Sequence, residues 1–165
     1  MGILNFGATV VSPGLVSTSQ IITNHPTVNL AVVRIPAVLC NAARFGVISP
    51  IFLESRVQAV PTAVLVAGWG PITADKEPNS VLRFIRTTVE SSFTPPGDPA
   101  PPQIPCPNHS TTLCTWNIMC STDVGGPLVT PAGLIGVAST TECGGLDTYL
   151  RISAYRDWIA ANTGV

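Results

Sequence analysis

The hydrophobic positions of this chain fall in short runs rich in β-branched residues, with turn residues between the runs. Runs of this kind predict strands rather than helices. The expected strands span residues 8–11, 20–23, 28–35, 47–53, 60–67 and 80–89. Within the last run, the core-facing residues are expected to be Val81, Phe84 and Val89, whereas Arg83 and Arg86 face solvent. The pattern is typical of antiparallel sheets with one buried face, so we predict an all-β fold.

One segment near the end of the chain has helical spacing instead. Residues 153–162 place Tyr155, Trp158 and Ile159 on one face of a helix. We therefore predict a single C-terminal helix, with Ser153 as its N-cap residue.

The composition agrees with a folded chain that has many turns. Of the 165 residues, 45% are hydrophobic and 10% are charged, which is too apolar for a disordered protein. The 14 glycines and 16 prolines favour short elements. Half of residues 94–107 are prolines, which cannot donate to a sheet, so this segment is predicted to be an extended surface loop.

The charge of the chain argues against two classes of partner. Eight Lys and Arg against nine Asp and Glu give a formal net charge of −1, which provides no basic surface for nucleic acid or anionic lipid. Arg34 and the prolines keep every apolar run well short of the ~18 residues of a membrane span. Residues 1–6 lack the basic and apolar regions of a signal peptide. We predict neither nucleic acid nor membrane as a partner, and no cofactor.

The cysteines indicate an oxidising compartment. Four of the five lie between Cys106 and Cys143, and two disulfides in an extracellular protein are the favoured explanation. The alternative is a tetrahedral zinc site, because thiolates and an imidazole at short spacing suit that metal. Its ligands would be Cys106, His109, Cys114 and Cys120.

Three motifs, in this order, link the chain to a known family. They are VAGWG at residues 66–70, CSTDVGGPLV at residues 120–129 and YLRISAYRDWI at residues 149–159. With them the chain resembles the trypsin and chymotrypsin-like serine proteases, most closely the digestive insect members. Residues 2–5, 24–26 and 29–35 match more weakly. The resemblance implies two antiparallel β-barrels with a cleft between them and a C-terminal helix docked on the first barrel. Residues 1–60 would form an incomplete first barrel, and residues 61–165 the second.

The positions that the resemblance assigns to the catalytic triad cannot perform the family's reaction. That reaction needs a serine nucleophile, a histidine base and an aspartate that orients the histidine. Val124 stands at the nucleophile position and Asn29 at the aspartate position, and the segment that would hold the histidine is absent. His25 is expected to be a turn residue before a proline. Loss of the nucleophile alone costs about 10⁶ in kcat in another serine protease, so we expect an inactive homologue.

The resemblance also assigns a substrate cleft. Its residues would be Ile118, Met119, Thr122, Ser139, Thr140 and Thr141. Thr122 replaces a glycine whose backbone N–H stabilises the oxyanion in the family, and its Cβ restricts that geometry. Because Ile118 and Met119 stand at the pocket base, we expect an apolar cleft with no carboxylate there. Trp116 is the aromatic residue expected to take part in binding.

Asp123 corresponds to a carboxylate that pairs with a newly cleaved α-amino group in active relatives. Removing one partner of a buried ion pair costs about 3–5 kcal/mol. We therefore expect Asp123 to be solvated, hydrogen-bonded by backbone amides, or neutral through a raised pKa, in a zymogen-like or disordered loop.

The resemblance further implies the disulfides Cys106–Cys114 and Cys120–Cys143. Cys40 is not part of these implied pairs. It is expected to be either a buried small hydrophobic residue or half of an intermolecular disulfide.

Three hypotheses about function follow. The first is a non-catalytic serine protease homologue, a secreted binding or regulatory protein with an unknown protein or peptide partner. The second is a fragment of a longer serine endopeptidase, whose open sheet edges, like Cys40, could support self-association. The third, and least favoured, is an active hydrolase that uses a different set of catalytic residues. Asn108-His109-Ser110 also matches the acceptor pattern for N-glycosylation, which matters only if the chain is secreted.

Overall fold

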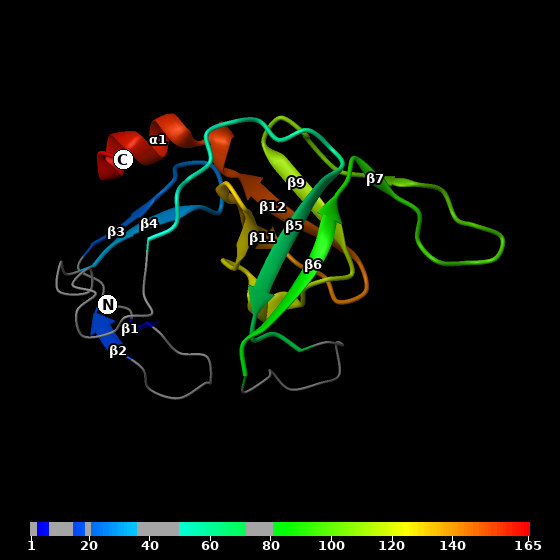
Figure 1. Ribbon diagram of the computed structural model, residues 1–165, viewed down its shortest axis with the longest axis horizontal. Helices are drawn as coiled ribbons and strands as arrows, with labels where there is room; N and C mark the ends of the chain where they lie inside the picture. The colour runs from blue at the N-terminus through cyan, green and yellow to red at the C-terminus, as the bar shows by residue number, and fades with distance from the viewer. Residues whose placement is uncertain (1–2, 7–14, 19–20, 36–49, 72–80) are drawn as a thin grey trace.

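The computed structural model describes residues 3–6, 15–18, 21–35, 50–71 and 81–165 (Figure 1). The predicted strand at residues 8–11 and Cys40 lie outside these residues. The described strands are β1 (Ile3–Phe6), β2 (Leu15–Thr18), β3 (Ile21–Asn24), β4 (Ala31–Arg34), β5 (Thr62–Gly68), β6 (Arg83–Val89), β7 (Ser92–Phe93), β8 (Ile104–Pro105), β9 (Thr112–Trp116), β10 (Pro127–Thr130), β11 (Gly133–Thr140) and β12 (Leu146–Arg151). Helix α1 (Arg156–Thr163) follows, and Ser121–Asp123 and Ile152–Ala154 form 3₁₀ turns.

Most of the core belongs to one antiparallel sheet of six strands, in the order β6-β5-β10-β11-β12-β9. The sheet curls into a half-barrel, so its two edge strands approach each other. The Glu90 N–H, just after β6, donates to the Cys114 carbonyl in β9 at 3.3 Å. Leu128, Ile135 and Tyr149 are completely buried inside the curl. This architecture confirms the prediction of a mostly β fold.

The inside and outside of β6 were predicted only in part. Val89 is buried and Arg83 and Arg86 are exposed, as expected. Phe84 in β6 and Val81, two residues before this strand, are 64% and 51% exposed, so their assignment to the core was wrong. The reason is that β6 is an edge strand, and only its last residues reach the place where it closes on β9.

The N-terminal part forms separate two-stranded sheets, β1 with β2 and β3 with β4. The expected strand at residues 28–35 is shorter in the structure, because the chain turns at residues 26–29 and the His25 N–H donates to the Leu30 carbonyl at 2.8 Å. The expected strand at residues 47–53 is reduced, within its described part, to a single bridge between Leu53 and Leu134. The boundary at residue 60 stays a prediction.

Helix α1 lies beside β3 and β4, the position that the resemblance implied (Figure 1). The predicted cap was wrong: Ser153 belongs to the 3₁₀ turn, and Tyr155 occupies the N-cap position without a side-chain bond. At the other end, Gly164 adopts a φ of +77° and its N–H donates to the Ala160 carbonyl at 2.8 Å. This left-handed conformation explains why a glycine ends the helix.

The proline-rich segment is a surface loop, as predicted. It is anchored at its two ends by the short pair β7 and β8 and extends away from the sheet (Figure 1).

Disulfides join Cys106 to Cys114 and Cys120 to Cys143. These are the pairs that the family resemblance implied. They consume the three cysteines of the alternative zinc site, so that alternative is wrong.

Candidate functional site

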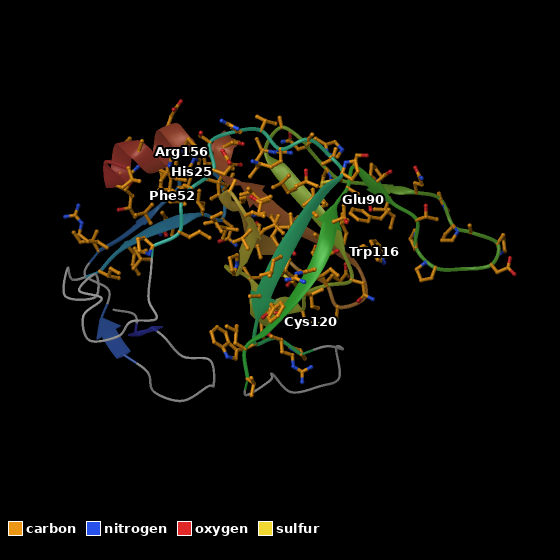
Figure 2. The ribbon with its side chains drawn as sticks, viewed as in Figure 1. His25, Phe52, Glu90, Trp116, Cys120 and Arg156 are labelled. Carbon is orange, nitrogen blue, oxygen red and sulfur yellow. A yellow bond between two sulfur atoms is a disulfide. The ribbon has the colours of Figure 1, made fainter. Side chains whose placement is uncertain are left out.

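A small pocket of about 90 Å³ lies at the end of the half-barrel where β5 ends and β6 begins. Cys120, labelled in Figure 2, lies at this end of the sheet. The pocket is lined by Val66, Ala67, Gly68, Gly70, Pro71, Arg83, Phe84, Ile85, Asn117, Ile118, Met119 and Asp123. It thus brings together the motifs at residues 66–70 and 120–129, which are separated by the 49 residues 71–119 in the sequence.

Asp123 is held against the first of these motifs. Its Oδ1 accepts a hydrogen bond from the Gly70 backbone N–H at 2.7 Å. A Cβ at Gly68 or at Gly70 would overlap the same carboxylate. The two glycines on either side of Trp69 therefore provide the space that Asp123 occupies. Of the outcomes expected for Asp123, the structure shows hydrogen bonding by a backbone amide; the zymogen-like character of its loop stays a prediction.

A second carboxylate, which the sequence analysis did not single out, lies behind the predicted pocket base. Asp147 is completely buried, and its Oδ2 accepts hydrogen bonds from the N–H groups of Ile118 at 2.9 Å and Met119 at 3.1 Å. Thr115 Oγ1 donates to the same oxygen at 3.3 Å and lies 3.0 Å from the Tyr149 hydroxyl. Asp147 does not line the pocket, whereas Ile118 and Met119 do. The apolar pocket base without a carboxylate therefore stays a prediction.

The surroundings of Asp147 affect its protonation. Burial raises the pKa of this carboxyl above its ordinary value of 3.8, although the hydrogen bonds from Ile118, Met119 and Thr115 act in the opposite direction. Burial also raises the pKa of the neighbouring Tyr149 hydroxyl. The sequence contains an indication of this buried carboxylate. Asp147 is the one charged residue in the run Leu-Asp-Thr-Tyr-Leu at residues 146–150. It lies two residues before Tyr149, so the two side chains share one face of β12.

Val124, which the family resemblance assigns to the nucleophile position, follows the 3₁₀ turn and is 44% exposed. The loop is fixed beside the end of β11: the Gly125 N–H donates to the Ala138 carbonyl at 2.8 Å, and the Ala138 N–H donates to the Gly126 carbonyl at 2.9 Å. Val124 therefore lies next to the strand that contains Ser139. Its side chain presents only carbon and hydrogen to solvent.

The other predicted cleft residues surround this loop. Ile118 is half-buried and Met119 is buried, both against the pocket. Thr122 is exposed in the 3₁₀ turn, and Ser139, Thr140 and Thr141 lie at the end of β11 and just beyond it. Their roles in substrate binding stay predictions.

Asn29 and His25 lie in the β3–β4 hairpin. Asn29 is exposed in the turn at residues 26–29. The His25 ring contacts Tyr155 and Trp158 edge-on, with ring centroids 5.4 Å and 4.9 Å apart, and Figure 2 shows it beside α1. His25 thus packs the hairpin against the C-terminal segment, as suits a turn residue.

Trp116 makes a structural contact, and its role in binding stays a prediction. Its ring stacks on Phe93 with centroids 6.0 Å apart, next to the Cys106–Cys114 disulfide. The sequence analysis placed Trp116 in a short loop, whereas the structure places it at the end of β9.

Within the described residues, no group of three or more His, Cys, Asp and Glu side chains is placed to hold a metal ion. In the same part of the chain, no helix has the length and apolar character to cross a membrane.

Comparison with known proteins agrees with the arrangement of these motifs. The family model described as Trypsin matches residues 13–159. Trypsin alpha-3 of Lucilia cuprina is 27% identical over 175 aligned positions, which cover 96% of this chain and 99% of that protein. Azurocidin of Homo sapiens is 32% identical over 115 positions, which cover 68% of this chain but only 43% of azurocidin.

Solved structures share the fold. HL collagenase superposes with a TM-score of 0.69 at 24% identity, covering 99% of this chain and 76% of the collagenase. Human heparin binding protein superposes with a TM-score of 0.65 at 24% identity, covering 88% of this chain and 66% of that protein.

Proposed function

Because the chain belongs to the trypsin family of serine proteases, we propose that it is a member without catalytic activity that acts by binding a protein or peptide. The observation that carries this proposal is Val124. It stands between Asp123 and Gly125, where the family has its nucleophile, and its exposed side chain has no atom that can attack a carbonyl carbon. Asn29, at the position of the catalytic aspartate, has no negative charge to stabilise an imidazolium ion.

A retained binding role is supported by the hydrogen bonds that fix the backbone around the predicted cleft. The Asp147 carboxylate holds the backbone of Ile118 and Met119, and Asp123 is hydrogen-bonded to Gly70. These contacts shape the predicted pocket base without contributing to bond cleavage. The base presents the apolar side chains of Ile118 and Met119, so we propose a peptide with an apolar side chain as the ligand.

The charge of the chain favours a peptide over an anionic polymer. One structural neighbour is named for binding heparin, which is a polyanion. This chain has a net charge of −1, and a polyanion gains little from such a surface. The disulfides and the trypsin-type relatives support an extracellular location.

A second candidate is that this sequence is part of a longer protease-like protein. This chain covers only 43% of azurocidin and 76% of HL collagenase, and this partial coverage supports the second candidate. Intact-mass measurement of the natural protein tests it: a polypeptide well above 17.2 kDa after removal of glycans would support this candidate.

Loss of catalysis can be tested with a fluorophosphonate probe, which reacts covalently with activated serines. We expect no labelling of this chain and no hydrolysis of peptide substrates, with active trypsin as the positive control. Covalent attachment of the probe to any residue would overturn the proposal of a non-catalytic protein.

Binding can be tested with a peptide library and the variant Ile118→Asp. A charge at the apolar base is expected to weaken binding of peptides with apolar side chains at least tenfold, about 1.4 kcal/mol. Ile104→Asp makes the same chemical change on the exposed β8 and should leave binding unchanged. Thermal unfolding of both variants shows whether the fold is kept. Equal binding by the two variants would contradict a ligand at Ile118.

A further inference from the structure

We propose that Asn108 is a site of N-linked glycosylation. The sequence Asn108-His109-Ser110 fits the acceptor pattern, in which any residue except proline separates asparagine from serine or threonine. None of the other asparagines in the 165-residue sequence is followed two residues later by serine or threonine. The proposal concerns a modification, and it does not depend on how the cleft works.

The acceptor lies at the tip of a tight turn between β8 and β9. The backbone N–H groups of Thr111 and Thr112 both donate to the Asn108 carbonyl, at 3.0 Å and 2.9 Å. Asn108 has a φ of +47°, a conformation that asparagine tolerates better than most residues. Residues 107–110 are all exposed. A glycan attached here would extend into solvent and displace no part of the core.

The two side chains that define the acceptor pattern are already in contact. The Ser110 hydroxyl donates a hydrogen bond to Asn108 Oδ1 at 2.8 Å. This bond engages the amide oxygen and not Nδ2, which is the atom that receives the sugar. The turn therefore presents both groups on the same exposed surface.

The chemistry requires a lipid-linked oligosaccharide as the second reactant, supplied with its transferase in the secretory pathway. A bond forms between Asn108 Nδ2 and the anomeric carbon of the first sugar. The bond between that carbon and the lipid pyrophosphate oxygen breaks, the lipid pyrophosphate leaves, and Nδ2 loses one proton. No oxidation or reduction is involved.

The neighbouring disulfide links this turn to the compartment that performs the reaction. The Cys106–Cys114 disulfide closes the loop that contains the acceptor. Disulfides of this kind form in the same oxidising compartment in which asparagine receives glycans.

The glycan would leave the candidate pocket open. The turn adjoins Thr112 at one end of β9, whereas the pocket segment that begins at Asn117 follows the other end. A strand of this length separates the two by roughly 13 Å. Glycosylation and ligand binding can therefore be tested independently.

The experiment uses the full chain, directed into the secretory pathway of a eukaryotic cell and analysed by mass spectrometry. We expect a mass loss on treatment with peptide N-glycosidase, with conversion of Asn108 to aspartate. Ser110→Ala should abolish the shift, while Ser110→Thr, which restores the acceptor pattern, should retain it.

Both the secreted and the retained cellular pools should be analysed, because the sugar is attached before export. Unmodified Asn108 in both pools, with the disulfides formed, would overturn the proposal. A mass loss that persists in Ser110→Ala would also overturn it, since the glycan would then be attached elsewhere.

Discussion

The six-stranded sheet and the β3–β4 hairpin contain similar apolar residues but bury them to very different extents. In the sheet, Leu128 and Ile135 are completely buried. In the hairpin, Ile21 and Ile22 are 54% and 52% exposed. Among the described residues, every buried apolar side chain lies at or after Val64. Apolar character therefore does not determine burial by itself; a strand also needs neighbouring strands that close over it.

The hairpin has its main described packing partner in the C-terminal segment. His25 contacts Tyr155 and Trp158, and β4 lies against α1. A cavity of about 410 Å³ remains between the hairpin and the end of the helix, lined by Ile21, Thr23, Val32, Val33, Arg34, Asn162 and Thr163. The hairpin is therefore held at one end and loosely packed beside the helix.

The most severe test of this comparison is truncation in the sheet. Leu128→Ala removes a fully buried side chain from the centre of the core. We expect the free energy of unfolding to fall by about 2–5 kcal/mol, because a cavity is left behind. Chemical denaturation measures this loss.

The matched variant in the hairpin is Ile22→Ala. Because this side chain is half exposed, the free energy of unfolding is expected to change by only about 0.5 kcal/mol. Equal losses in the two variants would show that the two regions do not differ as described.

The second test concerns the contact between the motifs at the pocket. Gly70→Ala places a Cβ on the Asp123 carboxylate and displaces it from the Gly70 N–H. We expect the free energy of unfolding to fall by about 1–3 kcal/mol, the cost of an unsatisfied polar group that is partly buried.

The decisive control for this variant is a double-mutant cycle. In an Asp123→Ala background the new methyl group no longer meets the carboxylate, so Gly70→Ala is expected to cost much less than it does in the wild type. Additive losses in the double variant would show that Asp123 is not the residue that requires a glycine at position 70.

The same comparison explains how much of the fold could be predicted from the sequence. Strand periodicity located β5 and β6 within a few residues, and the family resemblance implied antiparallel barrels, of which the structure shows a half-barrel sheet, and a docked C-terminal helix. Phe84 was wrongly assigned to the core, because it lies two residues from the exposed Arg86 and therefore shares its face of the strand. The cap at Ser153 was wrong because a 3₁₀ turn comes between β12 and α1.

The candidate site was predictable only in its chemistry. Once the family motifs were recognised, the residue types at Val124 and Asn29 could be read directly from the sequence. The same motifs marked Asp123 as the carboxylate that pairs with an α-amino group in active relatives. Asp147 was missed because its role depends on register: pairing of β12 with β9 places Asp147 opposite Thr115, near the backbone of Ile118. A contact across two strands cannot be obtained from the spacing within either strand.

The third test uses the buried carboxyl of the sheet. Burial raises the pKa of Asp147 above 3.8, so the folded state holds its proton more tightly than the unfolded state. As the pH rises from about 3 to about 7, the unfolded chain ionises first, and the wild type loses stability relative to Asp147→Asn, by about 1.4 kcal/mol for each unit by which the pKa is raised.

Denaturation of both proteins across this pH range measures the effect. The difference between their free energies of unfolding should be constant below the unfolded pKa and then change in favour of Asp147→Asn. Parallel curves would contradict a raised pKa, and a relative gain by the wild type with rising pH would show that the hydrogen bonds outweigh burial.

The smallest expected effect belongs to the hairpin. His25→Ala removes the ring contacts to Tyr155 and Trp158, which are worth about 0.5–1.5 kcal/mol. Because the sheet has its own core, the loss should appear as local opening of β3 and β4 rather than as global unfolding. Hydrogen exchange separates the two: amides paired between β3 and β4 should exchange faster, whereas those of Leu113 and Thr115 in β9 should not change. Faster exchange in both regions would mean that the hairpin and the half-barrel unfold as one unit, and that their different burial does not make them independent.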